Sequence, residues 1–335
     1  MKKPIWQLCI VLSLFIALGS VYAQTDCNGI DRPIVFAGLD WDSAQANNAI
    51  AGHILEAGFG CTTEDIPGST VPLVQGLVRG DIDINMEIWF NTAPDTWHEA
   101  VETGEVLDLG LNMAAQELSF LVPRYLVEGD AERGIEALAP GLRSIEDLPE
   151  HAALFKDPEE PDKGRYYNCI IGWQCELVNN NKFKAYDLEG VFTNFRPGTA
   201  AALASSLAAA YEKGEPWLGY YWGPTWVLGE YDMIALEEPA YSDECWAGDQ
   251  GCAFPTSIVN VSVSREFADN ASQEMLDFLE AFELDSVMVS RLLAFMRTND
   301  AEASDAALEF LKNESDVWTS WVSEEVAERV LASLN

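Results

Sequence analysis

The stretch "PIVFAGLDWDSAQANNAIAGHILEAGFGCTTEDI" (residues 33–66) determines the predicted fold. Pro33–Leu39 is a short apolar run typical of a buried strand, and residues 43–58 have the periodicity of a helix that ends at Gly58. Residues 61–66 predict a second strand. This order of strand, helix and strand favours a mostly parallel sheet with helices on its faces.

The same alternation continues after this stretch. A helix is expected over residues 69–79, a strand over 81–89 and a helix over 94–103. The "DIDIN" segment (81–85) resembles the start of a calcium loop, but its polar residues alternate with isoleucines and the glycine that such a loop requires is missing. We therefore predict a strand with one polar face.

A second α/β unit begins with the apolar segment 118–127 and a loop-rich stretch that extends to about residue 163. Its expected elements are a helix from about Trp173, strands over 190–195, 216–222 and 232–236, a helix over 198–214 and a short helix over 223–230.

A strand over 256–264 then returns to the first unit, and the tail from about residue 266 is expected to be helical. The predicted lobes are residues 24–117 plus 257–335 and residues 118–256. Ligands favour the carboxyl ends of such strands and the cleft between two domains. The fold class is therefore α/β, with two lobes that close on a ligand.

The N-terminus predicts a cleaved signal peptide over residues 1–23. Met1-Lys2-Lys3 precedes an apolar core, and "VYA" (21–23) supplies the small residues of a cleavage site. A membrane anchor is the weaker alternative because the apolar run is shorter than the roughly 20 residues that a spanning helix needs. We expect a free, soluble, exported protein without membrane insertion.

The chain is strongly acidic, with 55 Asp and Glu against 19 Lys and Arg and a formal net charge of −36. Nucleic acids and anionic membranes would repel such a surface, so neither is an expected partner. The acidic residues are scattered among apolar ones, which argues against a disordered tail.

Six cysteines remain after the signal peptide, and an even count in an exported protein predicts disulfides. Six cysteines allow 15 connectivities. Proximity in sequence suggests three pairs, namely Cys169–Cys175, Cys245–Cys252 and, by what remains, Cys27–Cys61. A zinc site is the rival, but the spacings differ from those of structural zinc and the chain has three histidines in all. No metal is expected.

Enzyme signatures are missing from the sequence. It contains no Gly-x-Ser-x-Gly elbow, phosphate-binding loop or His-Glu-x-x-His, and the three histidines form no recognisable constellation. We predict a binding protein without catalytic residues or cofactor. A secreted enzyme acting on a trimethylammonium compound is the alternative from another class. A binding protein for another solute, such as an amino acid, is the third.

Three tryptophans carry the prediction of the ligand. Trp89, Trp173 and Trp222 each stand where a strand ends or a helix begins, in segments from both lobes. Each alone could be an ordinary core residue. Together they predict a box of ring faces suited to a quaternary ammonium group, to which each face contributes about 0.5–2 kcal/mol.

The segments around these tryptophans resemble the glycine betaine and proline betaine binding proteins of ABC importers and their choline-binding relatives. "CIIGWQCE" (169–176) is similar to that family's disulfide-flanked tryptophan segment, and "GYYWGPTWV" (219–227) and "GDIDINMEIWFN" (80–91) are similar to its other two cage segments. The resemblance implies a type II-like periplasmic binding protein. It implies a cage of Trp89, Trp173 and Trp222, a periplasmic location, delivery to an ABC permease, no cofactor and a monomer.

The resemblance also implies how a betaine carboxylate is held. The backbone N–H groups of Gln174 and Cys175 would meet it at a helix N-terminus. Family members add a histidine a few residues after the tryptophan matched by Trp89, where this chain has Pro94. The nearest histidine is His98, and Asn91 is a possible substitute.

Two further residues concern the ligand's identity. Trp41 falls where choline-binding relatives carry a cage tryptophan. Glu87 lies two residues before Trp89 on one strand, so it should face the same side and favour a cation without a carboxylate. Alternatively, Glu87 caps a backbone group or meets solvent. The expected ligand is glycine betaine, then choline, proline betaine, carnitine or a sulfonium analogue.

Overall fold

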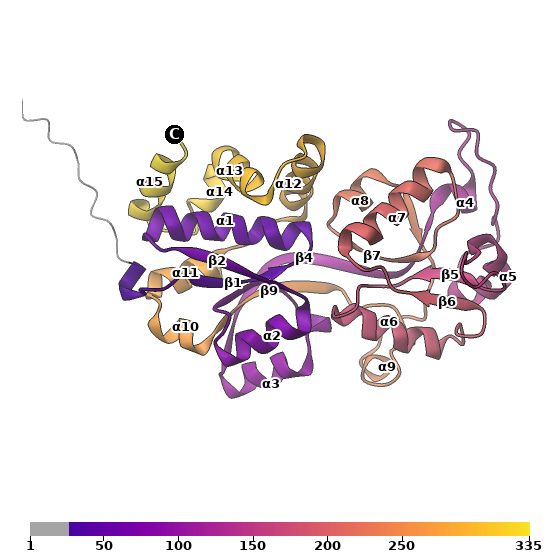
Figure 1. Ribbon diagram of the computed structural model, residues 1–335, viewed down its shortest axis with the longest axis horizontal. Coiled ribbons are helices and arrows are strands. Elements are labelled where there is room, and N and C mark those ends of the chain that lie inside the picture. The colour runs from indigo at the N-terminus through magenta and orange to yellow at the C-terminus, as the bar shows by residue number, and fades with distance from the viewer. Residues whose placement is uncertain (1–26) are drawn as a thin grey trace, which may run out of the picture.

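The computed structural model describes residues 27–335, and the predicted signal peptide lies outside these residues. The described chain has two parts arranged side by side along its long axis (Figure 1). A nine-stranded sheet runs through both parts in the order β2-β1-β3-β9-β4-β7-β5-β6, with β8 paired to β4. No helix in the described chain is long and apolar enough to cross a membrane.

The sheet is parallel at its ends and antiparallel in its middle, where β4 pairs with β9, β7 and β8. The strands are β1 (Ile34–Leu39), β2 (Thr63–Gly68), β3 (Ile84–Trp89), β4 (Val106–Pro123), β5 (Gly164–Tyr167), β6 (Phe192–Phe195), β7 (Gly219–Gly223), β8 (Met233–Ala235) and β9 (Ser257–Ser264).

Helices cover both faces of the sheet in the first part. In Figure 1, the upper face carries α1 and the C-terminal helices α12–α15, whereas α2, α3 and α10 lie below. The bounds are α1 (Asp42–Phe59), α2 (Thr70–Arg79), α3 (Asp95–Thr103), α10 (Arg265–Asn270), α11 (Gln273–Ala281), α12 (Ser286–Asn299), α13 (Ala303–Asn313), α14 (Ser315–Trp318) and α15 (Glu324–Ser333).

The second part carries its own helices around β5, β6 and β7. They are α4 (Arg124–Glu128), α5 (Leu148–His151), α6 (Gln174–Ala185), α7 (Ala200–Lys213), α8 (Trp226–Glu230) and α9 (Asp243–Ala247). Single 3-10 turns stand at η1 (Cys27–Gly29), η2 (Phe90–Thr92), η3 (Ile145–Asp147) and η4 (Ala152–Phe155). The α/β class predicted from the sequence is confirmed.

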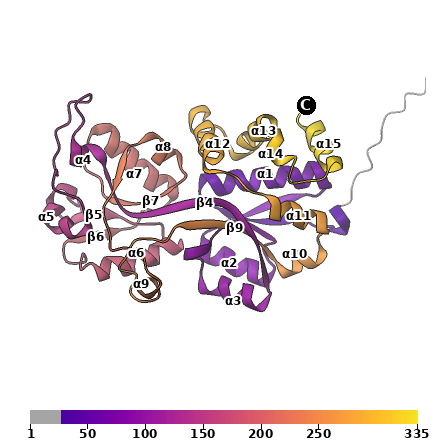
Figure 2. The same cartoon turned by 180° about the vertical axis from the view of Figure 1, so that it is seen from behind.

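Strand β4 joins the two parts, and its first half was not predicted from the sequence. It pairs with β9 through Ala115 and with β7 from Gln116 onward, and Figure 2 shows β4 and β9 running from one part into the other. Its register shifts between Asp108 and Gly110 and again between Leu111 and Met113. Each shift interrupts the alternation of apolar and polar residues from which a strand is recognised.

Asp83, the polar residue at the centre of "DIDIN" (81–85), connects two strands of the first part. Asp83 is buried, accepts two hydrogen bonds from Arg32 at 2.6 and 2.8 Å, and accepts a third from the Val35 N–H at 2.8 Å. Because all three bonds hold β1 against the start of β3, Asp83 has a structural role.

The first helix ends at Phe59, one residue beyond its predicted end. Gly60, with φ of 75°, is the left-handed cap of α1, a conformation that favours glycine. Gly58 is needed for packing, since a Cβ there would come within 2.7 Å of Val326 in α15. Gly58 thus allows the last helix of the chain to lie close against α1.

Candidate ligand-binding site

A pocket of about 450 Å³, including its mouth, lies between the two parts of the molecule. All six residues predicted from the sequence to meet the ligand through an aromatic ring or a helix N–H group line it. The lining residues are Trp41, Thr70, Ile88, Trp89, Thr92, Ala93, Pro94, Glu117, Trp173, Gln174, Cys175, Tyr220 and Trp222.

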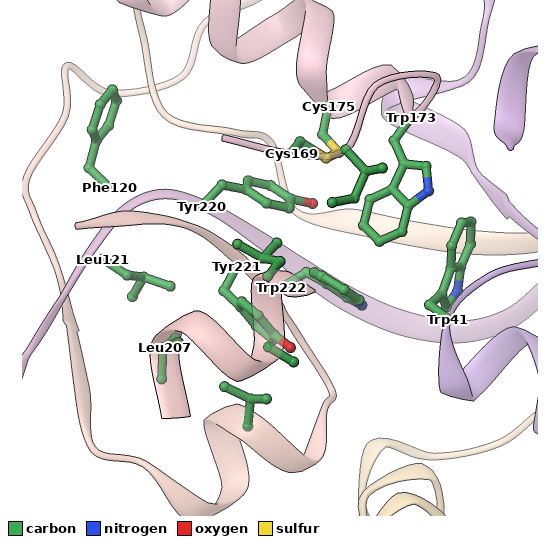
Figure 3. Close-up of a cluster of buried hydrophobic side chains, with 14 of the residues drawn as sticks. Trp41, Phe120, Leu121, Cys169, Trp173, Cys175, Leu207, Tyr220, Tyr221 and Trp222 are labelled. Atoms are coloured by element: carbon green, nitrogen blue, oxygen red, sulfur yellow. A yellow bond between two sulfur atoms is a disulfide. The ribbon is translucent and has the colours of Figure 1, made fainter. Parts of the chain in front are cut away.

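Three buried tryptophans form adjoining walls of this pocket. The ring centroids of Trp41 and Trp173 lie 5.0 Å apart with an interplanar angle of 76°, and those of Trp173 and Trp222 lie 5.2 Å apart at 84°. Figure 3 shows Trp173 between the other two. Because neighbouring rings are nearly perpendicular, their faces can surround a small group from several sides.

The indole N–H groups of Trp173 and Trp41 have partners within the protein. Trp173 Nε1 donates to Asp40 Oδ1 at 2.9 Å, which connects the second part to the first. Trp41 Nε1 donates to Glu87 Oε2 at 2.6 Å. Each of these hydrogen bonds occupies the indole N–H group and fixes the orientation of the ring. The ring, and not its N–H group, therefore lines the pocket.

Glu87 lies behind Trp41 and is not among the lining residues. Its carboxylate also accepts from Asn47 Nδ2 at 2.8 Å, and burial raises the pKa of Glu87 to about 7. It is 2% exposed, so it does not meet solvent, and the partners of its carboxylate are side chains. The register of β3 with β9 shifts between Asn85 and Ile88. This shift breaks the alternation of side chains from which Glu87 was predicted to face the same side as Trp89.

The disulfide loop from Cys169 to Cys175 places Trp173 at the start of α6. Trp173 is the extended N-cap residue, and α6 begins at Gln174. Gly172 has φ of 94°, and a Cβ there would meet Ser69 Oγ at 2.5 Å. The loop therefore lies against the first turn of α2 in the other part, and glycine is required for this approach. Cys27–Cys61 and Cys245–Cys252 are also bonded.

Two residues proposed from the sequence for a carboxylate lie elsewhere. Asn91 Nδ2 donates to the Thr256 carbonyl at 2.6 Å, and His98 packs with its ring against Phe90 and Trp97. Neither residue is part of the lining. The family's histidine has no counterpart in this pocket, where its segment contributes Thr92, Ala93 and Pro94 instead.

The structure adds a carboxyl group that the sequence did not indicate. Glu117 Oε1 accepts from the Tyr220 hydroxyl at 2.9 Å, while Oε2 lies 3.3 Å from Thr92 Oγ1 and 3.5 Å from Ser257 Oγ. Burial raises the pKa of Glu117 to about 7. Tyr220 could have been found, because it precedes Trp222 by two residues on one strand. Glu117 was missed because it belongs to β4.

A second contact between the two parts lies outside the pocket, in a groove on its far side. Trp226 in α8 hydrogen-bonds the carboxylate of Asp42, and the Arg297 guanidinium of α12 lies 4.5 Å from the centroid of its ring. Burial raises the pKa of Asp42. The first part therefore holds a tryptophan of the second part between an acid and a cation.

Comparison with known proteins agrees with this arrangement. Residues 32–313 match the model of the family described as the substrate-binding domain of ABC-type glycine betaine transport systems. The chain belongs to this family. The resemblance drawn from the tryptophan segments is thereby confirmed.

Two curated relatives are distant in sequence. The trimethylamine N-oxide-binding protein of Pelagibacter ubique is 23% identical over 324 residues, which are 95% of this chain and 99% of the relative. The glycine betaine/proline betaine-binding periplasmic protein of Salmonella typhimurium is 22% identical over 193 residues, which are 53% of this chain and 58% of the relative.

Two solved structures share the fold. An ABC-transporter choline-binding protein in complex with choline has a TM-score of 0.72 and 18% identity, covering 92% of this chain and 99% of that one. Lactococcal OpuAC, in its closed conformation complexed with glycine betaine, has a TM-score of 0.67 and 18% identity. The match covers 88% of this chain and all of that one. The two-lobe fold predicted from the sequence is confirmed.

Proposed function

We propose that this protein is the periplasmic receptor of an ABC importer. It binds a small solute that carries a fully methylated nitrogen and delivers it to the permease as a monomer. The observation that carries this proposal is the group of Trp41, Trp173 and Trp222, whose rings come from both parts of the chain and meet nearly at right angles. Such faces attract a methylated cation that cannot form a strong hydrogen bond.

Ligands with a small polar end fit this pocket better than those with a carboxylate. No Arg, Lys or His is among the lining residues described, and Glu117 supplies an acidic group. A betaine carboxylate would rely on the N–H groups of Gln174 and Cys175 at the start of α6. Choline and trimethylamine N-oxide are therefore our leading candidates, ahead of glycine betaine. The curated relative named for trimethylamine N-oxide matches 95% of this chain, whereas the one named for glycine betaine and proline betaine matches 53%.

Binding is proposed to proceed by closure of two lobes, residues 24–117 plus 257–335 and residues 118–256. The change of partner in β4 between Ala115 and Gln116 supports the first of these boundaries. Ligand contacts from both lobes favour the closed state, and no bond is broken. The permease then distinguishes the closed, loaded receptor from the open one.

The contact around Trp226 should contribute to closure without touching ligand. Replacing Arg297 by alanine removes a cation–π contact of about 0.5–1 kcal/mol and is expected to weaken ligand binding about two- to fivefold. Calorimetric titration measures this change. The matched control is Arg291→Ala on the same helix, because Arg291 pairs with Glu314 within one part. Equal affinities for the two variants would show that the Trp226 contact does not favour closure.

Calorimetry with a panel of solutes tests the proposed function. Purified protein is titrated with choline, trimethylamine N-oxide, glycine betaine and L-proline. Saturable binding of at least one methylated compound, and a weaker response to L-proline, is expected. Binding of none of the methylated compounds would contradict the proposal. Recovery of unchanged ligand by NMR after long incubation is also expected, since turnover would favour an enzyme.

A further inference from the structure

The carboxylate of Glu87 lies behind the ring walls of the ligand pocket. It accepts hydrogen bonds from Trp41 Nε1 at 2.6 Å and from Asn47 Nδ2 at 2.8 Å. The indole of Trp89 and the hydroxyl of Ser43 also donate to it. Trp41 and Trp89 both line the pocket, whereas Glu87 does not. One buried carboxylate is therefore joined to two tryptophans of the pocket through their N–H groups.

Glu87 has uncharged partners. Its residue is 2% exposed, and no ion pair found among residues 27–335 includes it. Asp83, four residues earlier, is also buried but pairs with Arg32 at 2.6 Å. The partial positive charge at the N-terminus of α1, whose cap residue is Trp41, offsets part of the cost of burying Glu87. A full positive charge is still missing.

The charged groups nearest to Trp41 in the sequence are acidic as well. Asp40 and Asp42 flank it, and their carboxylates bond indoles of the second part. Glu117 lines the pocket itself, and no Arg, Lys or His is among the lining residues described. A methylated cation in the pocket would therefore supply the positive charge that Glu87 lacks.

A negative charge behind an indole strengthens the attraction of its face for a cation. The attraction of the ring is itself electrostatic. A carboxylate that accepts the indole N–H group adds its own charge to this attraction. Because the site is buried, the effective dielectric constant is lower than in water and the interaction is screened less. The ring then contacts the ligand, and the carboxylate behind it supplies the charge.

We propose that Glu87 is the counter-charge of the ligand's methylated nitrogen and acts on it through the rings of Trp41 and Trp89, which it also holds in position. This inference rests on the proposed function. Glu87 is a positioning residue with an electrostatic effect, since it touches the rings and not the ligand. The expected consequence is a stronger preference for a methylated cation over an uncharged group of the same shape than the rings alone would give.

The protonation of Glu87 should be linked to ligand binding. Burial raises the pKa of Glu87 to about 7 in the unliganded protein. A cation stabilises the carboxylate form, so binding should lower this pKa and release protons near pH 7. By the same linkage, the part of the affinity that Glu87 supplies should be lost as pH falls below about 7. The groups that bond Glu87 are two indoles, an amide and a hydroxyl, none of which titrates in this range.

Carbon isosteres separate the effect of charge from that of shape. Wild type and Glu87→Gln are titrated with the methylated solute that binds most tightly and with its neutral isostere, by tryptophan fluorescence. The isostere is neohexyl alcohol for choline and tert-butyl alcohol for trimethylamine N-oxide. Glutamine keeps an oxygen for Trp41 Nε1 and removes the charge. We expect the solute to bind about tenfold more weakly to the variant, and the isostere to change by less than about threefold.

Two results of this titration would overturn the inference. Equal losses for the solute and its isostere would show that Glu87 only positions the rings. An unchanged affinity for the solute would show that Glu87 has no effect on binding. If the wild type binds none of the methylated compounds, the proposed function itself fails.

Calorimetry at about pH 7, in two buffers of different ionisation enthalpy, measures the protons released on binding. In the wild type, the methylated solute should release more protons than its neutral isostere does, and this comparison requires no variant. Glu87→Gln should release fewer protons than the wild type. This comparison between proteins is needed because burial raises the pKa of Glu117 to about 7 as well. Equal release by the two proteins, or by the two ligands in the wild type, would contradict the inference.

Asp83→Asn is the matched control. Asp83 is a buried carboxylate in the same segment, but its charge is paired with Arg32 and it does not line the pocket. The control variant should bind the solute and release protons like the wild type. Thermal unfolding verifies that both variants are folded, and near-UV circular dichroism verifies that the tryptophan rings of Glu87→Gln keep their surroundings.

Discussion

Replacing Trp173 by alanine is expected to weaken binding of the methylated solute about a hundredfold or more. The substitution removes one ring face, worth about 0.5–2 kcal/mol to a desolvated cation. It also removes the edge contacts with Trp41 and Trp222, each worth about 0.5–1.5 kcal/mol. The hydrogen bond to Asp40, which joins the two parts, is lost as well.

Calorimetric titration of the variant with the tightest ligand measures this loss. Trp246→Ala is the matched control, because Trp246 packs against Tyr241 and Phe254 in the same part of the chain and does not line the pocket. It should bind like the wild type. An affinity for Trp173→Ala within about threefold of the wild type would mean that the ligand does not rest on this ring.

Replacing Lys182 by methionine should lower the free energy of unfolding by about 3–5 kcal/mol at pH 8. Lys182 is fully buried and Glu238 nearly so, and their ion pair measures 2.8 Å. Burial lowers the pKa of Lys182 and raises that of Glu238, so each charge is tolerated because of the other. Methionine would leave the carboxylate of Glu238 buried without its cation.

The pH dependence of this loss has a definite sign. A carboxyl whose pKa is raised in the folded state is less costly when protonated, so the destabilisation by Lys182→Met should shrink as pH falls towards about 5. The double variant Lys182→Met with Glu238→Gln should recover most of the loss, since it removes the unpaired charge. Urea unfolding measures the free energy of unfolding of the wild type, of Lys182→Met and of the double variant. A loss that is independent of pH and is not recovered would contradict this account.

Much of the fold could be predicted from residues 33–103, because β1 and β3 are buried strands and the helices of this range end at glycines such as Gly60 and Gly80. The first half of β4 could not be predicted, since its register shifts hide the alternation. The four-residue strand β5 was missed for another reason, because so short a segment carries little periodic signal.

Some residues of the candidate site could likewise be predicted from the sequence, and others could not. Trp41, Trp89, Trp173 and Trp222 stood out in the sequence because large aromatic residues at strand ends are conspicuous, and the structure gathers all four around one pocket. Their role as ligand contacts stays a prediction. Glu117 was not foreseen, because its place in the pocket depends on β4 passing from one part of the molecule to the other.

A crystal structure of the protein with its tightest ligand is the most direct test of the central claim. We expect the methylated nitrogen within about 6 Å of the ring centroids of Trp173 and Trp222, with the polar end of the ligand towards Glu117. Ligand found in the groove beside Arg297, or in the pocket with its methyl groups directed away from the rings, would contradict the account.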